Sequence, residues 1–124
     1  HTLFALVASF AALAVMLFTS PTSPLVQPRS VVGGHLIAVV TAIAFDYLTS
    51  SQHLHVLPQW VALGAVPGIT VTLMTRSGLI HPPAVACAVI YLEGDPEIKN
   101  ARWLFLAVPV LLDCFVLLVM ALLV

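Results

Sequence analysis

The sequence predicts an all-α membrane protein, a bundle of about four transmembrane helices plus a short, re-entrant or crossing helix in its second half. Two observations predict this fold. Hydrophobic residues make up 61% of the 124 residues and charged residues 7%, with a mean hydropathy of +1.14. Apolar runs also recur along the chain, and about 17 to 25 apolar residues in a helix cross a bilayer core of roughly 30 Å. We therefore expect a single transmembrane domain that covers residues 1–124.

The expected spans follow the apolar runs, with prolines and polar residues between them. Pro67 lies in the third run, between Gly64 and Gly68. Their small-xxx-small spacing lets a neighbouring helix approach closely. The last run begins beside Trp103, whose ring suits a membrane interface. The four expected spans are residues 2–18, 31–48, 57–75 and 102–124.

A histidine and a proline pair interrupt the chain after the third run. Pro82 and Pro83 carry no amide hydrogen, and Pro82 disfavours helical geometry at His81. The third helix should therefore stop before His81. A new helix over residues 84–92 should begin with Pro83 in its first turn. That helix is too short to cross alone, and residues 93–101 beyond it form a polar loop.

The four basic residues bear on whether the short helix crosses the bilayer. If it is re-entrant, Arg29, Arg76, Lys99 and Arg102 all face one side of the membrane. The bias of cytoplasmic loops toward basic residues then favours the re-entrant path. If the helix crosses, the four residues divide two and two.

Composition argues against several classes of protein. A net charge of −1 with only four Lys and Arg makes no basic stripe, so nucleic-acid binding is not expected. Cys87 and Cys114 lie in apolar stretches and should be buried small residues rather than a disulfide. No nucleophile and base stand at a readable spacing, so neither an enzyme nor a cofactor is expected. Because the chain starts at His1 and ends within an apolar run, we expect it to belong to a longer protein.

One short pattern occurs twice. Arg-Ser, then glycine, then histidine appears from Arg29 to His35 and again from Arg76 to His81, each time between two apolar runs. If two-helix units repeat with the same orientation, both connectors face the same side and can meet. Interrupted segments at matching positions in two halves are a pointer to a transporter's substrate site. Chance similarity in so biased a composition is the alternative.

These motifs together resemble the HPP family of integral membrane proteins, which is named for its His-Pro-Pro triplet. The resemblance covers nearly the whole chain. It rests on residues 23–36, with Gln27-Pro28-Arg29 followed by Gly33-Gly34-His35, on His81-Pro82-Pro83-Ala84, and on Trp103 to Val124 with Pro109-Val110-Leu111-Leu112.

The resemblance implies a domain of about four transmembrane helices. Plant and cyanobacterial members of the family are associated with nitrite transport, in chloroplasts for the plant ones. Two features depart from the family pattern. Asp113 stands where a small or apolar residue is expected, and the loop from Glu93 to Asn100 is longer and more charged than in compact bacterial members.

Arg29 and Arg76 are the candidate anion ligands. Arginine stays charged, and its planar fork suits a bent oxyanion. The alternative is that both only anchor helix ends at lipid headgroups. Gly33, Gly34 and Gly78 let the backbone approach a ligand or let helices pack closely. The amides of the helix that begins at Pro82 and Pro83 complete the expected substrate-binding site.

His35 and His81 can donate hydrogen bonds to an anion or carry protons with it. The alternative is that carbonyl groups freed at a broken helix satisfy both side chains. A metal site is not expected, because two histidines without a third ligand make a poor tetrahedral set.

Asp113 is the candidate for proton coupling. It lies in the middle of the last span, where an ionised carboxylate costs about 2.5 to 3.5 kcal/mol on insertion scales. It should face the bundle interior, pair with a cation or hold a proton. A neutral carboxylic acid bonded to a neighbouring helix is the alternative.

The sequence thus favours a transporter or channel for a small inorganic anion, with nitrite first because of the resemblance. A membrane-embedded structural or regulatory module is the alternative. A homo-oligomer is expected because four short helices enclose little space. The protein should be integral to a membrane, whether plasma, bacterial inner or organelle membrane.

Overall fold

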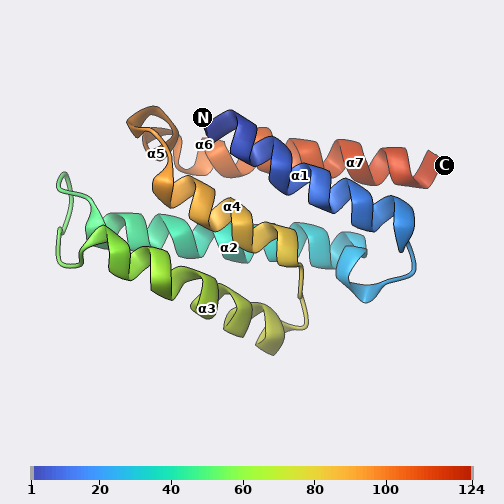
Figure 1. Cartoon of the computed structure of the whole chain (residues 1–124), viewed down its shortest axis with the longest axis horizontal. Helices are drawn as coiled ribbons and strands as arrows, with labels where there is room; N and C mark the ends of the chain where they lie inside the picture. Colours follow the sequence, from blue (N-terminus) through green and yellow to red (C-terminus); the bar gives the residue numbers. More distant parts are fainter. Residues whose placement is uncertain (1, 124) are drawn as a thin grey trace.

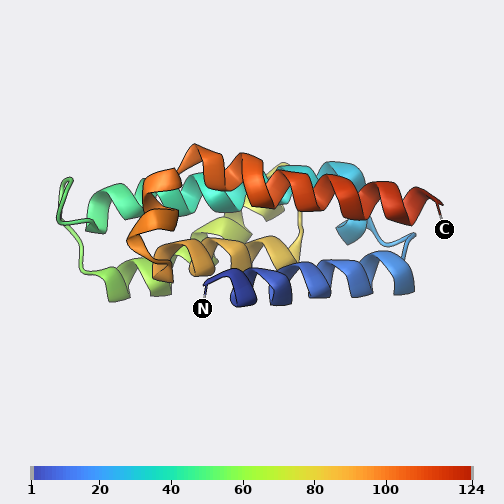
Figure 2. The ribbon, with the colours of Figure 1, turned by 90° about the horizontal axis from the view of Figure 1, so that it is seen from above.

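The computed structural model describes residues 2–123, and it describes side chains for residues 7–108 and 110–123. Every regular element in this part of the chain is helical, and the long helices lie side by side along one axis (Figures 1 and 2). In chain order the elements are α1 (Thr2–Thr19), a 3₁₀ turn (Pro24–Val26), α2 (Pro28–Thr49), α3 (Gln59–Ser77), α4 (Pro82–Glu93), α5 (Pro96–Ala101), α6 (Trp103–Phe105), a π-helical stretch (Leu106–Leu111) and α7 (Leu112–Leu123).

The break between α3 and α4 is confirmed, and glycine and proline explain it. Gly78 caps α3 in the left-handed conformation, with φ 68° and ψ 24°, which glycine adopts without a steric penalty. His81 is extended, with φ −147° and ψ 95°, as expected before a proline. Pro82 and Pro83 then occupy the first turn of α4, where a missing amide hydrogen costs little.

The re-entrant path is wrong, because α4 runs antiparallel to α3 and packs against α1, α2 and α3 (Figure 1). Gln59 Nε2 donates to the carbonyl oxygen of Leu92 at 3.0 Å, so α4 ends where α3 begins. Lys99 beyond α4 likewise reaches Asp46 near the end of α2. The basic residues therefore divide two and two, and they indicate no orientation in the membrane.

Helix α4 begins inside the bundle rather than at its surface. Its 12 residues extend about 18 Å at 1.5 Å per residue, well short of a bilayer core. The non-helical segment from Gly78 to His81 connects its start to the end of α3. His81, fully buried, is therefore held at an interruption in the middle of the bundle.

Three other expectations need correction. Helix α2 begins at Pro28, so the Gly33-Gly34-His35 motif lies within the helix and not in a connector. The last span is interrupted at Val108, with φ −139° and ψ 118°, because a residue before proline is disfavoured in helical geometry. The polar loop of residues 93–101 contains the short helix α5.

Two stretches are long and apolar enough to cross a membrane, among the residues whose placement is described. They are Pro28–Thr49, with 22 residues, and Trp103–Leu123, with 21. Val7–Thr19 and Pro82–Glu93 are shorter apolar helices. The helical fold is thus confirmed, and a count of about four spans stays a prediction.

The two histidine motifs meet, as expected, because α2 has no side chains where they touch. A Cβ added at Gly34 would lie 2.6 Å from His81 Cβ and 3.2 Å from the carbonyl oxygen of Leu79. A Cβ added at Gly33 would lie 2.7 Å from Leu79 Cδ1. The glycines therefore allow the segment before α4 to lie directly on α2.

We predict that Gly34→Ala destabilises the bundle by about 1 to 3 kcal/mol, since the new methyl group overpacks a site bounded by backbone. Thermal unfolding in detergent measures the effect. Gly68→Ala is the matched control, because a Cβ there meets nothing within 4 Å. Equal midpoints for the two variants would contradict the close approach of His81 to α2.

Candidate functional site

Two buried histidines form the centre of the bundle. His35 comes from the second turn of α2, and His81 precedes the first residue of α4. Both side chains are 0% exposed. Their ring centroids lie 5.0 Å apart, with an angle of 47° between the rings.

Each ring is held by a backbone carbonyl on its Nδ1 side. His35 Nδ1 lies 2.8 Å from the carbonyl oxygen of Val31, and His81 Nδ1 lies 2.7 Å from that of Leu25. A carbonyl oxygen only accepts, so Nδ1 carries the hydrogen in both rings. In the neutral ring Nε2 then offers a lone pair. Neither Nε2 atom has a hydrogen-bond partner, although both are buried.

Helices α1 and α7 close the site. The ring of Phe10 stacks on His35 with centroids 6.2 Å apart. Cys114 Sγ lies 3.4 Å from His35 Nδ1. Ser9 Oγ donates to the carbonyl oxygen of Pro83 at 2.9 Å and lies 3.1 Å from Cys87 Sγ. These contacts tie α1 to the first turns of α4 and enclose the pair in protein.

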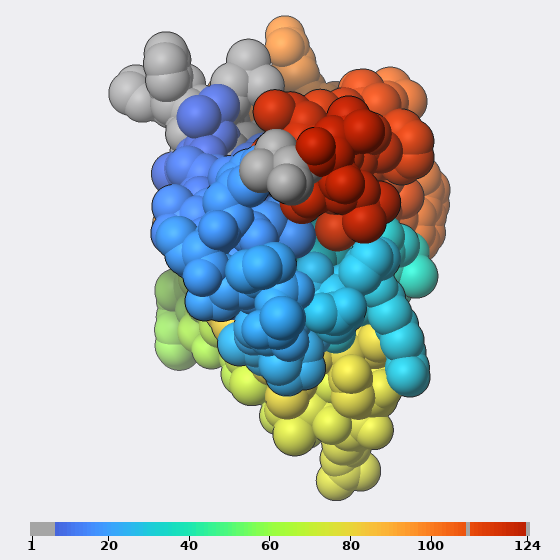
Figure 3. Space-filling view, turned by 90° about the vertical axis from the view of Figure 1, so that its right-hand side faces the viewer, coloured from blue at the N-terminus to red at the C-terminus, as the bar shows by residue number. Residues whose placement is uncertain are grey.

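The arginines predicted as ligands do not join the histidines in this arrangement. Arg29 and Arg76 are exposed, near the start of α2 and the end of α3. Figure 3 views the molecule from the side where the cyan start of α2 and the yellow end of α3 are both visible. The structure thus brings together the imidazole groups of the two motifs and leaves their guanidinium groups at the surface.

The start of α4 offers fewer amides than expected. Pro82 is exposed and Pro83 is buried, and neither has an amide hydrogen. The amide of Ala84 already donates to the carbonyl oxygen of His81 at 3.2 Å. Of the glycines predicted to bind substrate, Gly33 and Gly34 contact the segment before α4, and Gly78 is exposed.

Asp113 lies outside the histidine pair, in a groove of about 310 Å³ between α1 and α7. Phe10 lines this groove and also stacks on His35. Phe10 is therefore a neighbour of both the groove and the imidazole ring of His35. The groove is lined by Val7, Phe10, Ala11, Ala14, Asp113, Val116 and Leu117.

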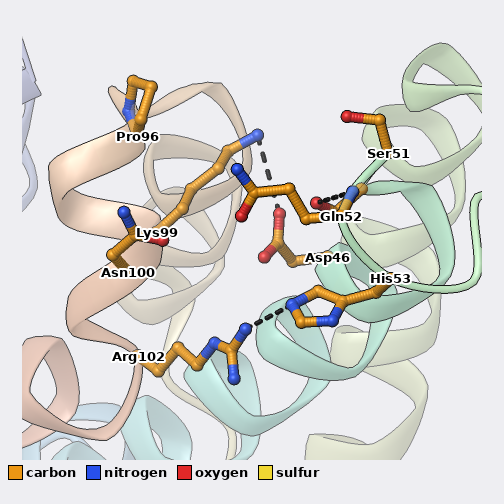
Figure 4. A pocket seen from close by; sticks show the side chains of 9 residues that line it. Asp46, Ser51, Gln52, His53, Pro96, Lys99, Asn100 and Arg102 are labelled. Atoms are coloured by element: carbon orange, nitrogen blue, oxygen red, sulfur yellow. Dashed lines mark hydrogen bonds and ion pairs between the residues drawn. The ribbon is translucent and has the colours of Figure 1, made fainter.

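A second polar cluster, which the sequence did not predict, lies at the opposite end of the bundle (Figure 4). Lys99 Nζ pairs with Asp46 Oδ1 at 3.6 Å, and the Asp46 side chain is only 6% exposed. Arg102 donates to Tyr47 Oη and His53 Nε2, and its guanidinium carbon lies 4.4 Å from the centroid of the Tyr47 ring. The side chains of Asp46, His53, Lys99 and Arg102 border a cavity of about 190 Å³.

The sequence signal for this cluster was the polarity of residues 46–59 and 93–102. It was missed because a re-entrant helix would have separated the two segments by the thickness of the membrane. The antiparallel course of α4 instead places them at one end. Among the described residues, no three His, Cys, Asp or Glu side chains come together as a metal site.

Apolar helices that lie along one axis around a buried polar centre form the architecture of an integral membrane protein. Comparisons with known proteins agree. A sequence model described as "HPP, transmembrane region" matches residues 1–124. Two transmembrane proteins of Dictyostelium discoideum are each 32% identical, over 96% and 100% of this chain. The chain spans only 40% and 38% of the lengths of those relatives. No solved structure matches it significantly.

The chain belongs to the HPP transmembrane family. The His81-Pro82-Pro83 triplet for which the family is named therefore interrupts the bundle between α3 and α4.

We predict that Lys99→Met destabilises the protein by about 1 to 3 kcal/mol, because it leaves the nearly buried Asp46 carboxylate without its cation. The effect is read as a lower unfolding midpoint in detergent. The double variant Asp46→Asn/Lys99→Met should recover part of the loss, since no unpaired charge remains. If the two substitutions act additively, the ion pair has no energetic role.

Proposed function

We propose that this domain carries or conducts a small inorganic anion across a membrane, with nitrite as the first candidate. The observation that supports the proposal is the buried His35–His81 pair, whose Nε2 atoms have no partner, at the start of a half-length helix. Family membership supports a membrane protein, and the resemblance of its motifs to nitrite-transporting members suggests the substrate.

The broken crossing is the structural argument for transport. Extended backbone at membrane depth is tolerated where it is buried in protein or lines a cavity. Discontinuous helices that begin near the middle of the bilayer form the substrate sites of many transporters. The segment from Gly78 to His81 followed by α4 has this form. Because both rings are fully buried, access requires a movement of the surrounding helices, as alternating access does.

Basic residues at both ends suit an anion. Arg29 lies near the start of α2 and Arg76 near the end of α3, and both are exposed. Lys99 and Arg102 border the cavity at the other end. Positive groups at a mouth raise the local concentration of anions. In the proposal, these residues attract the anion and the imidazole pair contacts it in the centre.

A homo-oligomer is part of the proposal. Gly64 and Gly68 are both exposed on α3, and a Cβ at either would meet nothing within 4 Å. A face of small residues lets a second helix approach closely in a bilayer. A second copy would also extend the small set of about four membrane-crossing helices around the site.

One observation favours the alternative, a membrane-embedded structural module. The Nδ1 bond of His35 lies within α2, and that of His81 ties the segment before α4 to the turn before α2. Such bonds stabilise a fold whether or not a substrate passes. Transport measurements separate the two possibilities.

We predict nitrite uptake into proteoliposomes above that of protein-free vesicles, and its loss in the His35→Leu/His81→Leu variant. The double substitution fills the site with apolar side chains and removes every imidazole nitrogen from it. His55→Asn is the matched control, because His55 is exposed and has a φ of 43°, which asparagine tolerates. Nitrate and formate, tested in parallel, define the substrate class. A folded wild-type protein without flux of any of the three anions would favour the structural module.

A further inference from the structure

The free nitrogen atoms of the two histidine rings are hydrogen-bond acceptors, and the hydroxyl group of Thr70 on α3 is the other fully buried group without a partner among the described residues. Both Nδ1–H groups donate to carbonyl oxygens. The remaining ring nitrogen of His35 and of His81 is therefore Nε2, which carries a lone pair and no hydrogen. A lone pair does not donate to an anion. The neutral site is therefore complementary to a proton, or to a ligand that brings one.

No fixed positive charge is present to offset an anion there. The chain has four Lys and Arg. Arg29 and Arg76 are exposed, and Lys99 and Arg102 are half-buried at the end with the polar cavity. A bare anion would leave water for a site without a compensating cation, which is strongly unfavourable.

We propose that the anion crosses together with one proton, which Nε2 of His35 or His81 accepts in the centre of the bundle. This inference rests on the proposed function and says which group offsets the charge of the anion in that site. Nε2 binds a proton from the aqueous side through its lone pair, and the resulting N–H⁺ donates to an oxygen of the anion. On the other side the anion and the proton leave, and the neutral ring is restored. No electrons move, and each cycle transfers no net charge.

The closeness of the two rings sets the number of protons. With centroids 5.0 Å apart, two imidazolium ions would repel each other strongly in a buried site. The pair therefore holds one proton at a time, which matches one monovalent anion.

The other titratable groups around the pair come from the helices packed on it. Cys114 on α7 lies beside His35, and Cys87 on α4 is paired with Ser9 of α1. Asp113 on α7 lines the groove between α1 and α7, together with Phe10. A thiol is neutral when protonated and negative when ionised, so it cannot supply a positive charge. The imidazole rings therefore remain the groups that can offset the anion.

The test uses wild-type protein in liposomes loaded with a pH-sensitive dye, with nitrite as the probe. One arm imposes an acidic exterior with the membrane potential clamped at zero, and the other imposes a potential without a pH gradient. Uptake in protein-free vesicles is subtracted in both arms, since the uncharged acid crosses lipid unaided. With nitrite at equal concentration inside and outside, we expect protein-dependent accumulation in the first arm only, with one proton entering per nitrite.

Uptake driven by the potential, without proton entry, would overturn the inference and leave the proposed function standing. Absence of protein-dependent flux in both arms would overturn the two together. These outcomes make the two failures distinguishable in one experiment.

Asparagine substitutions locate the proton acceptor. His81→Asn keeps an N–H where Nδ1 donates to Leu25, and it has no atom in place of Nε2. His35→Asn does the same toward Val31. We expect the doubly substituted protein to keep its unfolding midpoint near that of wild type and to lose proton-coupled uptake. His55→Asn is the control that keeps it. Proton-coupled uptake that persists in the doubly substituted protein would overturn the assignment.

Discussion

The segment before α4 lies directly on α2, and the rest of the structure depends on this contact. Gly33 and Gly34 leave room for Leu79 and His81, and the hydrogen bond from His81 to Leu25 fixes the segment against the turn before α2. Without this approach His81 would not reach His35. Helix α4 would also lose its central position against α1, α2 and α3.

Each residue of the His-Pro-Pro triplet has a separate structural role. His81 is the extended residue that reaches the turn before α2. Pro82, which is exposed, and Pro83, which is buried, start α4 without amide hydrogens that would need acceptors. The triplet therefore begins a helix inside the bundle without leaving unsatisfied donors at its first two positions. Among the described residues, the buried side-chain atoms without a hydrogen-bond partner are Nε2 of His35 and His81, Oγ1 of Thr70 and Oδ1 of Asp46, and two of these four therefore lie in the histidine pair.

The features that could be predicted from the sequence are those that local chemistry decides. The proline pair predicted that α3 stops before His81 and that α4 begins there, and Gly78 caps α3 in the structure. The repeated order of Arg-Ser, glycine and histidine predicted that the two motifs can meet, and the rings of His35 and His81 do. Both features follow from backbone preferences or from one pattern, with no need to know how helices pack.

The features that could not be predicted depend on tertiary contacts. The direction of α4 was wrongly inferred from four basic residues, and its true course is set by packing and by the bond from Gln59 to Leu92. The surface position of Arg29 and Arg76 reflects where α2 begins and where α3 ends, which charge alone does not specify. The interruption at Val108 was within reach, because Pro109 follows it, and the long apolar run concealed it.

The most direct measurement of the central claim is magic-angle-spinning NMR of the protein in lipid bilayers, with its histidines labelled with ¹³C and ¹⁵N. The account predicts a through-space contact between the rings of His35 and His81, assigned by comparison with the two single asparagine variants. At neutral pH both rings should be neutral, with the hydrogen on Nδ1 and none on Nε2. Rings without mutual contact, or with the hydrogen on Nε2, would contradict it.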